Sequence, residues 1–384
     1  MLAALLFATS TLCHATPVKV TERVTDRVLD GCGGSNTENL LWHLDRADAI
    51  GGALNGSATR TATGKGAVVY VCDTGVMAAH DELARDGGGS AVIAGIDMLD
   101  PFCSATKNEA IEPCWSTDGS LEIFSHGTAV GSVIAGKTIG IAPDAKIVAV
   151  RIFGNEALWI KAMKAVIKHA YSADAPPFQT AIVNISGGVA LSPQPQFEAL
   201  MRTMIGGVDP DGNPDPNGKR FLFVVAAGNA TPFQNGKPIQ CAADYSVIIS
   251  PGYLGRDIDG LVTVGGIDRM NGLWSGSCFG YAVDVLAPAE EMFVASISAP
   301  NRYRYLPADQ ISGTSYATPY VSGMAARLLE KDPTLTPPQL EQLLKASPSI
   351  VLGLPVPVDA PPSPPRRRSA GVPPAVVERL ARRP

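Results

Sequence analysis

One serine in this sequence stands where a nucleophile could act. Ser315 lies in the run Gly313-Thr314-Ser315, shortly before an apolar, helix-like stretch at 320–329. A serine at the start of a helix exposes its hydroxyl, and its backbone N–H points to where negative charge develops on an attacked carbonyl. Because a serine hydroxyl is a weak nucleophile until a base takes its proton, Ser315 requires a histidine and a carboxylate elsewhere in the chain.

A histidine and an aspartate in suitable contexts precede this serine. His126, one of five histidines, is followed by the small residues of a Gly-Thr-Ala run. Asp73 follows the β-branched run 67–72, which predicts a buried strand that ends in an acid at a turn. Each residue has a structural alternative: Asp73 as a strand-ending turn, His126 as a capping residue and Ser315 as a helix N-cap. Their coincidence in the order Asp, His, Ser favours catalysis.

These three sites resemble the motifs of the subtilisin-like serine proteases. The matching runs are Val71-Cys72-Asp73-Thr74-Gly75, Ser125-His126-Gly127-Thr128 and Gly313-Thr314-Ser315-Tyr316-Ala317-Thr318-Pro319. The chain order Asp, His, Ser is that of subtilisin and differs from the orders in chymotrypsin and the α/β-hydrolases. The resemblance implies that Asp73, His126 and Ser315 form a catalytic triad. Residues 42–48 are similar to the mature opening of the proteinase K branch, so the resemblance spans roughly residues 40 to 345.

An asparagine follows a further apolar run, 221–227. In the resembling family, the asparagine of the corresponding Ala-Ala-Gly-Asn sequence donates its side-chain amide to the tetrahedral intermediate. The resemblance therefore implies that Asn229 and the N–H of Ser315 form an oxyanion hole. Asn229-Ala230-Thr231 also matches a glycosylation sequon, which we discount because a catalytic amide must lie inside the cleft.

The run 181–188 predicts a strand whose end carries no bulky side chain. An extended peptide could pair its backbone with such an edge. The run resembles the family's substrate-binding segment, although the larger apolar residue that often stands between its serine and its glycine pair is missing here. Pro251-Gly252 resembles the far wall of the specificity pocket. The substrate-binding residues that we expect are Ser186, Gly187, Gly188, Ala227 and Gly228.

Apolar strand-like runs alternate with helical stretches along the chain. The expected strands are 67–72, 146–152, 180–185, 221–227 and 261–265, and the expected helices are 127–135, 157–171, 195–205 and 316–330. This alternation predicts parallel βαβ units and a sheet covered on both faces. Subtilisin-like domains have that architecture, so we expect an α/β fold, a three-layer αβα domain with a mostly parallel sheet. Its expected bounds are 40–346.

The segments outside this domain have different compositions. Residues 1–15 have an apolar core and predict a signal peptide, although no Lys or Arg precedes Lys19. Residues 16–39 form a short segment, either a propeptide remnant or a linker. Residues 347–384 are rich in proline and arginine and predict an extended or disordered tail.

A signal peptide implies secretion, which suits the cysteine content. Removing Cys13 leaves six cysteines, for which fifteen pairings are allowed. We expect Cys103–Cys114, which brackets a short loop, and Cys241–Cys278, which flanks an expanded region. Cys72 lies in a buried strand and is expected to be a free packing thiol.

The composition fits an enzyme with a large core: 46% of the 384 residues are hydrophobic, 17% are charged and the net charge is −5. This charge does not indicate nucleic-acid or membrane-surface binding. We expect a monomer that acts on protein or peptide substrates, without nucleic-acid partners or stable membrane insertion.

The sequence therefore predicts a secreted serine endopeptidase that needs no cofactor. Family members often bind calcium for stability, and Asp209, Asp211 and Asp215 share a loop that either contributes to such a site or is a solvated turn. Two alternatives stay open. One is a catalytically silent subtilisin-like binding protein, and the other is an esterase or acyl-transfer variant that uses the same triad.

Overall fold

A seven-stranded sheet forms the centre of the molecule. The computed structural model describes residues 23–25, 41–49, 54, 57–100, 106–113, 121–230, 240–297, 303–304 and 312–359. Within them, the strand order is β4 (Val92–Asp97), β5 (Lys146–Arg151), β3 (Val68–Asp73), β6 (Thr180–Ile185), β7 (Arg220–Ala226), β8 (Leu261–Ile267) and β9 (Val285–Pro288). All neighbouring strands of this sheet are parallel. Their carboxyl ends therefore meet at one edge, where ligand-binding sites of such sheets lie.

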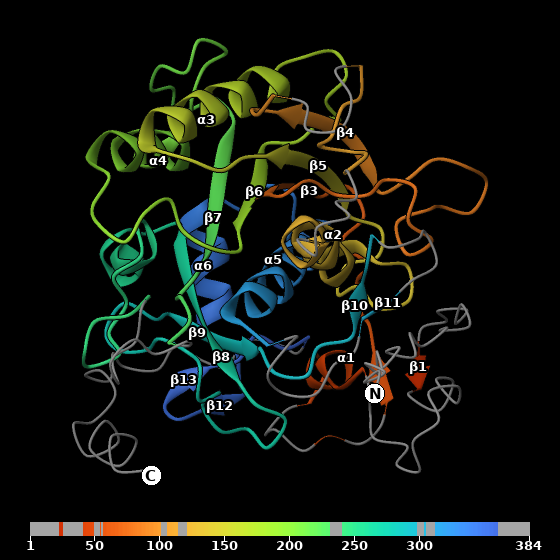
Figure 1. The fold of residues 1–384 in the computed structure, drawn as a ribbon, viewed down its shortest axis with the longest axis vertical. Coiled ribbons are helices and arrows are strands. Elements are labelled where there is room, and N and C mark those ends of the chain that lie inside the picture. Colours follow the sequence, from red (N-terminus) through yellow and green to blue (C-terminus); the bar gives the residue numbers. More distant parts are fainter. Residues whose placement is uncertain are drawn as a thin grey trace, which may run out of the picture.

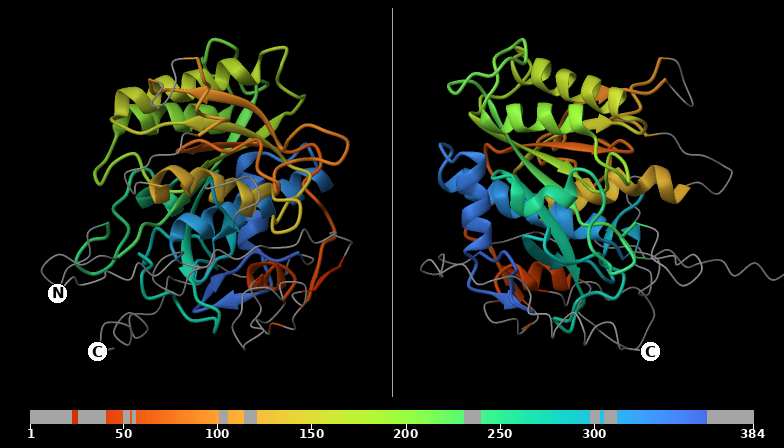
Figure 2. Two further views of the ribbon diagram at one scale, coloured as in Figure 1. Left: turned by 45° about the vertical axis from the view of Figure 1, so that its right-hand side comes forward. Right: turned by 90° about the vertical axis from the view of Figure 1, so that its left-hand side faces the viewer.

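Helices cover both faces of this sheet (Figure 1). α3 (Glu156–Ala170) and α4 (Pro195–Gly206) pack on one face, and α2 (Leu121–Ala135) and α5 (Thr314–Lys331) pack on the other. α6 (Pro337–Lys345) contacts α5. The two views of Figure 2 show the same three layers from the side. The predicted αβα fold is confirmed.

Burial explains why the sequence reveals the central strands. β3, β6 and β8 are buried along their whole length, as expected of parallel strands between two helical layers. All five predicted strands and all four predicted helices are present, with shifted bounds. The largest shift is at α2, which begins at Leu121 rather than at 127, so His126 lies inside a helix and not at its start.

The sequence analysis missed β4, β9 and α6. In β4, Gly95 interrupts the apolar pattern, and a Cβ there would lie 2.7 Å from Ile111 Cγ2. β9 has only four residues, one of them a proline. The smaller elements are α1 (Trp42–Arg46), the 3-10 helix η2 (Gly252–Asp257), and three antiparallel pairs, β1 (Arg23–Thr25) with β2 (Ser57–Thr59), β10 (Val294–Ala295) with β11 (Tyr303–Arg304), and β12 (Ile350–Val351) with β13 (Leu354–Pro355).

The prediction of an extended or disordered tail from residue 347 is wrong as far as Asp359. β12 and β13 form a hairpin in this segment, and Tyr320 Oη of α5 donates to the backbone oxygen of Pro357 at 2.9 Å. The Asp359 side chain is 2% exposed and pairs with Arg327 and Lys331 of α5, at 3.3 and 2.8 Å. The prediction failed because it relied on the high proline content, whereas several valines and a leucine of this segment are buried. Residues 360–384 lie outside the described part of the chain.

Two cysteine predictions are confirmed. Cys241 and Cys278 form a disulfide, and Cys72 is a buried free thiol whose pKa is raised by burial and by the neighbouring Asp73 charge. Cys103 and Cys114, together with residues 1–15 and most of 16–39, lie outside the described residues. No helix in the described part of the chain is both long enough and apolar enough to span a bilayer.

Candidate active site

Asp73 and His126 lie together at the carboxyl edge of the sheet. Asp73 ends β3 and its side chain is 5% exposed. His126 Nδ1 is 2.9 Å from both Asp73 Oδ1 and Asp73 Oδ2. The Thr74 N–H also donates to Asp73 Oδ1, at 2.7 Å, which helps to fix the carboxylate. Burial lowers the pKa of His126, but the Asp73 charge and hydrogen bond raise it by more, so the pKa lies above its ordinary value of 6.5.

Ser315 is the second residue of α5, and the residue after it contacts His126. The ring of Tyr316, the next residue, lies against the His126 ring, with 5.9 Å between the two centroids. Ser315 Oγ donates to the backbone oxygen of Ser186 at 2.9 Å. A transfer of its proton to His126 therefore requires the hydroxyl to turn away from Ser186.

A buried polar chain holds Ser186 in position. Asn184 Nδ2 donates to Ser186 Oγ at 2.9 Å, and Ser322 Oγ of α5 donates to Asn184 Oδ1 at 2.8 Å. Asn184 and Ser322 are fully buried. The end of β6 is thus hydrogen-bonded to the helix that carries Ser315, which fixes their relative position.

The Asn229 side chain is oriented by the residue before Ser315. Asn229 Oδ1 accepts from the Thr314 N–H at 3.0 Å and from Thr314 Oγ1 at 2.9 Å. Thr314 Oγ1 in turn accepts from the Gly228 N–H at 3.1 Å. With Oδ1 engaged in this way, the Nδ2 amide is the end of the side chain that is left to donate to a ligand. That is the atom an oxyanion hole needs.

A pocket that is open to solvent lies beside Ser315. Four of the five predicted substrate-binding residues line it, namely Ser186, Gly187, Gly188 and Gly228, together with Asn229 and Ser315. Ala227 does not, because its side chain is fully buried in the core. Among the described residues that line the pocket, none is Asp, Glu, Lys, Arg or His. This part of the wall is therefore suited to a neutral side chain.

Ile249 is among the residues that line this pocket, whereas the resemblance implied that Pro251-Gly252 would form its far wall. A Cβ at Gly188 would lie 1.7 Å from Ile249 Cγ2, and a Cβ at Gly228 would lie 2.5 Å from Ile249 Cδ1. The absence of side chains at the two glycines therefore leaves space for the Ile249 side chain. The three segments that contain these residues meet at the pocket. Pro251 and Gly252 are not among the lining residues.

Sequence reasoning missed several other lining residues. They are Ala190, Leu191, Ala226, Gln240, Ile249 and Thr314. The Thr314 side chain could have been found from its place next to Ser315. Gln240 had no such signal, because it lies eleven residues beyond Asn229 and outside the motifs quoted from the sequence.

The carboxylates of Asp209 and Asp215 in the acidic loop accept hydrogen bonds from residues of the same loop. Asp209 Oδ1 accepts from the N–H groups of Asp211 and Asn213, at 3.0 and 2.8 Å, and Asp209 Oδ2 accepts from Asn213 Nδ2 at 3.1 Å. Asp215 Oδ1 accepts from the Asn217 N–H at 2.9 Å. Across the described ranges, no three His, Cys, Asp or Glu side chains are grouped to hold a metal ion. This loop has the contacts of a solvated turn.

The molecule combines an αβα domain built on a parallel sheet with an Asp–His pair and a serine at a helix start. This is the arrangement of the serine hydrolases whose triad follows the chain order Asp, His, Ser. The family described as the Subtilase family (peptidase S8) matches residues 64–362 of the chain. This match covers most of the sequence, and the chain belongs to the subtilase family.

Individual relatives agree with this assignment. The chain is 29% identical to an alkaline extracellular protease of Yarrowia lipolytica, over 74% of this chain and 53% of that protein. It is 28% identical to a cuticle-degrading serine protease of Arthrobotrys oligospora, over 74% of this chain and 57% of that protein. The chain thus spans little more than half the length of these curated relatives. A solved cold-adapted subtilisin-like serine proteinase superposes with a TM-score of 0.60 at 26% identity, covering 83% of this chain and 98% of the other.

Proposed function

We propose that this protein is a secreted serine endopeptidase that cleaves peptide bonds through Asp73, His126 and Ser315. The observation that carries the proposal is the contact of His126 Nδ1 with both oxygens of Asp73, beside a serine at the start of α5. Subtilase family membership and the names of the relatives support the same activity.

The proposed reaction has two halves. In the first, Ser315 Oγ attacks the substrate carbonyl while His126 takes the hydroxyl proton, and His126 then gives this proton to the leaving amine. In the second, His126 takes a proton from water, the water oxygen attacks the acyl-enzyme, and Ser315 recovers its proton. The negative charge of Asp73 stabilises the imidazolium, and Asn229 Nδ2 with the Ser315 N–H stabilises the oxyanion in both halves.

Secretion is proposed on two grounds. A relative carries the word extracellular in its name, and the Cys241–Cys278 disulfide suits an oxidising compartment. The proposed substrates are proteins or peptides, taken by a monomer. The chemistry needs no cofactor, and calcium would have a structural role only.

A fluorophosphonate probe tests the proposal, because it reacts with an activated serine. The purified protein should become labelled and should cleave casein, and Ser315→Ala or His126→Ala should abolish both. Ser275→Ala, which removes an exposed serine, serves as the matched control and should change neither. A folded protein that neither labels nor cleaves would instead favour a silent binding protein. Labelling with turnover of esters but not of peptide amides would favour the esterase alternative.

A further inference from the structure

The turn of residues 228–230, which we call the oxyanion turn, is held from a second side. The contacts of Thr314 fix the Asn229 side chain, but they do not fix the Asn229 backbone. The backbone N–H of Asn229 donates to the side chain of Gln240, Oε1, at 2.9 Å. Gln240 is eleven residues further along the chain and also lines the pocket.

A short strand-like segment pairs with the other side of this turn. Asn229 and Ser277 form an antiparallel bridge. The Cys278 N–H donates to the Gly228 oxygen at 3.0 Å, and the Ala230 N–H donates to the Gly276 oxygen at 2.7 Å. Residues 276–278 therefore help to fix the position of the oxyanion turn relative to the end of β7.

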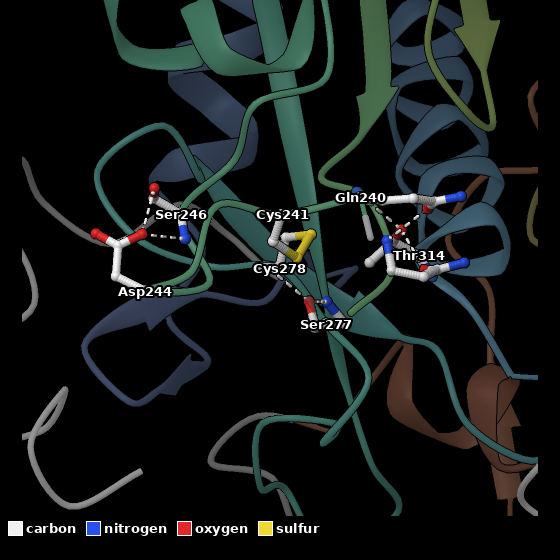
Figure 3. The surroundings of a disulfide bond; sticks show 10 residues. Gln240, Cys241, Asp244, Ser246, Ser277, Cys278 and Thr314 are labelled. Carbon is white, nitrogen blue, oxygen red and sulfur yellow. Dashed lines mark hydrogen bonds between the residues drawn. A yellow bond between two sulfur atoms is a disulfide. The ribbon is translucent and has the colours of Figure 1, made fainter. Parts of the chain in front are cut away.

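The disulfide connects these two supports. Cys278 belongs to the paired segment, and it is bonded to Cys241, the residue directly after Gln240. Figure 3 shows Gln240 and Thr314 on one side of the disulfide, and Asp244 and Ser246 on the other. Gly228, Cys278, Cys241, Gln240 and Asn229 thus form a closed ring of covalent bonds and hydrogen bonds. Gly228 packs closely against the disulfide in this ring, since a Cβ there would lie 3.1 Å from Cys278 Sγ.

From this ring we infer that Gln240 is a positioning residue for the oxyanion donor, and that the Cys241–Cys278 disulfide holds Gln240 in place. The inference rests on the proposed function, in which Asn229 Nδ2 binds the oxyanion. Such a donor is effective only if it is already aimed at the position the oxyanion will occupy, because reorientation during the reaction would raise the barrier. Gln240 does not touch the reacting atoms; it acts through the backbone of Asn229.

The first test is a double-mutant cycle between Gln240→Met and Asn229→Ala. Methionine has a similar length but lacks the amide oxygen, so the Asn229 N–H loses its acceptor. We expect Gln240→Met to lower kcat for a peptide anilide about tenfold, the effect of one hydrogen bond, with KM changed by less than roughly twofold. In the Asn229→Ala background the same change should have no further effect on kcat, because the donor it positions is gone.

A purely structural role would give a different result. Gln240→Met would then lower the Tm, and it would reduce kcat by the same factor with and without Asn229. Equal factors in the two backgrounds, or a normal kcat in the folded single variant, would overturn the inference. These outcomes are read on enzyme whose active sites have been counted with fluorophosphonate. A wild-type protein that takes up no probe would overturn the proposed function instead.

The second test removes the disulfide. We expect Cys241→Ser with Cys278→Ser to lower kcat selectively, and Gln240→Met to have a smaller effect in that protein than in the disulfide-bonded one. Ser246→Ala is the matched control, since the Ser246 hydroxyl donates to Asp244 on the far side of the disulfide and should not influence kcat. A disulfide-free enzyme with full kcat would overturn the role of the disulfide.

Discussion

In the proposed reaction, the contact between Asp73 and His126 sets the pH range in which the site can act, because His126 must be neutral to take the proton of Ser315. Its pKa is lowered by burial and raised by more through the charge and hydrogen bond of Asp73, so it lies above 6.5. We therefore expect kcat/KM for a peptide substrate to fall as the pH decreases through a value above 6.5. A pH–rate profile of the free enzyme measures this directly.

Removing the charge of Asp73 should shift that profile. In Asp73→Asn the imidazolium loses its partner, so the acidic limb should move to lower pH, and kcat should drop about 10⁴-fold because the asparagine amide favours the wrong tautomer of His126. Asp86→Asn, at an exposed aspartate, is the control. If the acidic limb stayed in place in Asp73→Asn, its pKa would belong to a group other than His126.

The roles that we propose for Asp73, His126, Ser315 and Asn229 depend on residue type and on short neighbouring runs, and the sequence carries both. These roles are therefore the part of the candidate site that a sequence can predict. Gln240 could not be found in this way. Glutamine is common on surfaces, and its contact with Asn229 lies next to a disulfide between two cysteines that are 37 residues apart in the sequence.

At the scale of elements, the pocket beside Ser315 is shaped by three segments that converge on Ile249. Val189 N–H donates to the Ser250 oxygen and Ser250 N–H donates to the Ala190 oxygen, both at 2.9 Å, so the segment after β6 is paired with the segment that carries Ile249. The buried carboxylate of Glu198 in α4 also accepts from Ser250 Oγ at 2.7 Å. These bonds make the wall rigid, so its shape should determine which side chains fit.

Shortening Ile249 should therefore broaden the specificity. In Ile249→Ala we expect the ratio of kcat/KM for a large apolar side chain to that for alanine, at the residue before the cleaved bond, to rise at least about tenfold, as a few methyl groups in a pocket allow. A series of peptide anilides measures the ratio. Leu191→Ala, at a rim residue that is half exposed, should change it much less. An unaltered ratio in Ile249→Ala would mean that large side chains bind elsewhere.

Helix α6 shows why the prediction of secondary structure from this sequence was incomplete. Its first two residues are prolines, which interrupt a helical pattern in the sequence, although proline is well suited to the first turn of a helix. Thr336 and Gln339 form a capping box there, with each side chain bonded to the other's backbone N–H. The signal Thr-x-x-Gln was present in the sequence. The buried parallel strands were predictable because their apolar runs are nearly continuous, whereas β9 is too short to show a pattern.

The capping box makes a stability prediction for this element. Thr336→Ala removes an N-cap side chain, and we expect it to lower the free energy of unfolding by about 1 kcal/mol. Chemical denaturation followed by circular dichroism measures the change. Thr334→Ala is the comparison, because Thr334 lies in the preceding turn and its hydroxyl donates to Asp332. An equal effect of the two substitutions would argue against the cap as the cause.

On the scale of the whole molecule, Asp359 joins the last described segment to α5 and to the start of the domain. Besides its ion pairs with Arg327 and Lys331, it accepts from the Thr61 N–H at 2.7 Å. The high proline content of this segment suggested an extended or disordered tail. Whether the segment is ordered depends instead on whether its few apolar residues are buried against the domain. No local pattern in the sequence encodes a contact between residues almost 300 positions apart.

Asp359→Ala should accordingly destabilise the protein as a whole. It leaves Arg327 buried without its carboxylate, and breaking a buried pair in this way costs about 3 to 5 kcal/mol. Burial raises the pKa of Asp359, but hydrogen bonds to Lys331 and Thr61 lower it by more, so the pKa lies below 3.8. The stabilisation should be complete above about pH 5 and should be lost as the pH falls below 3.8 toward the folded pKa.

Denaturation curves of wild type and Asp359→Asn across this pH range provide the check. The difference in unfolding free energy between the two proteins should be constant near neutral pH and should shrink in acid. A difference that persists unchanged at the lowest pH would assign the stabilisation to packing rather than to charge.

The layout of the site along the chain has a consequence for the protein's synthesis. Asp73 and His126 are made early, whereas Ser315 lies at the start of α5, after every strand of the seven-stranded sheet. If these residues act as we propose, a growing chain on the ribosome holds the base and its carboxylate partner but lacks the nucleophile until the sheet has been translated in full. The order of the residues would then delay the first moment at which the protein could hydrolyse its neighbours until after the sheet has been made.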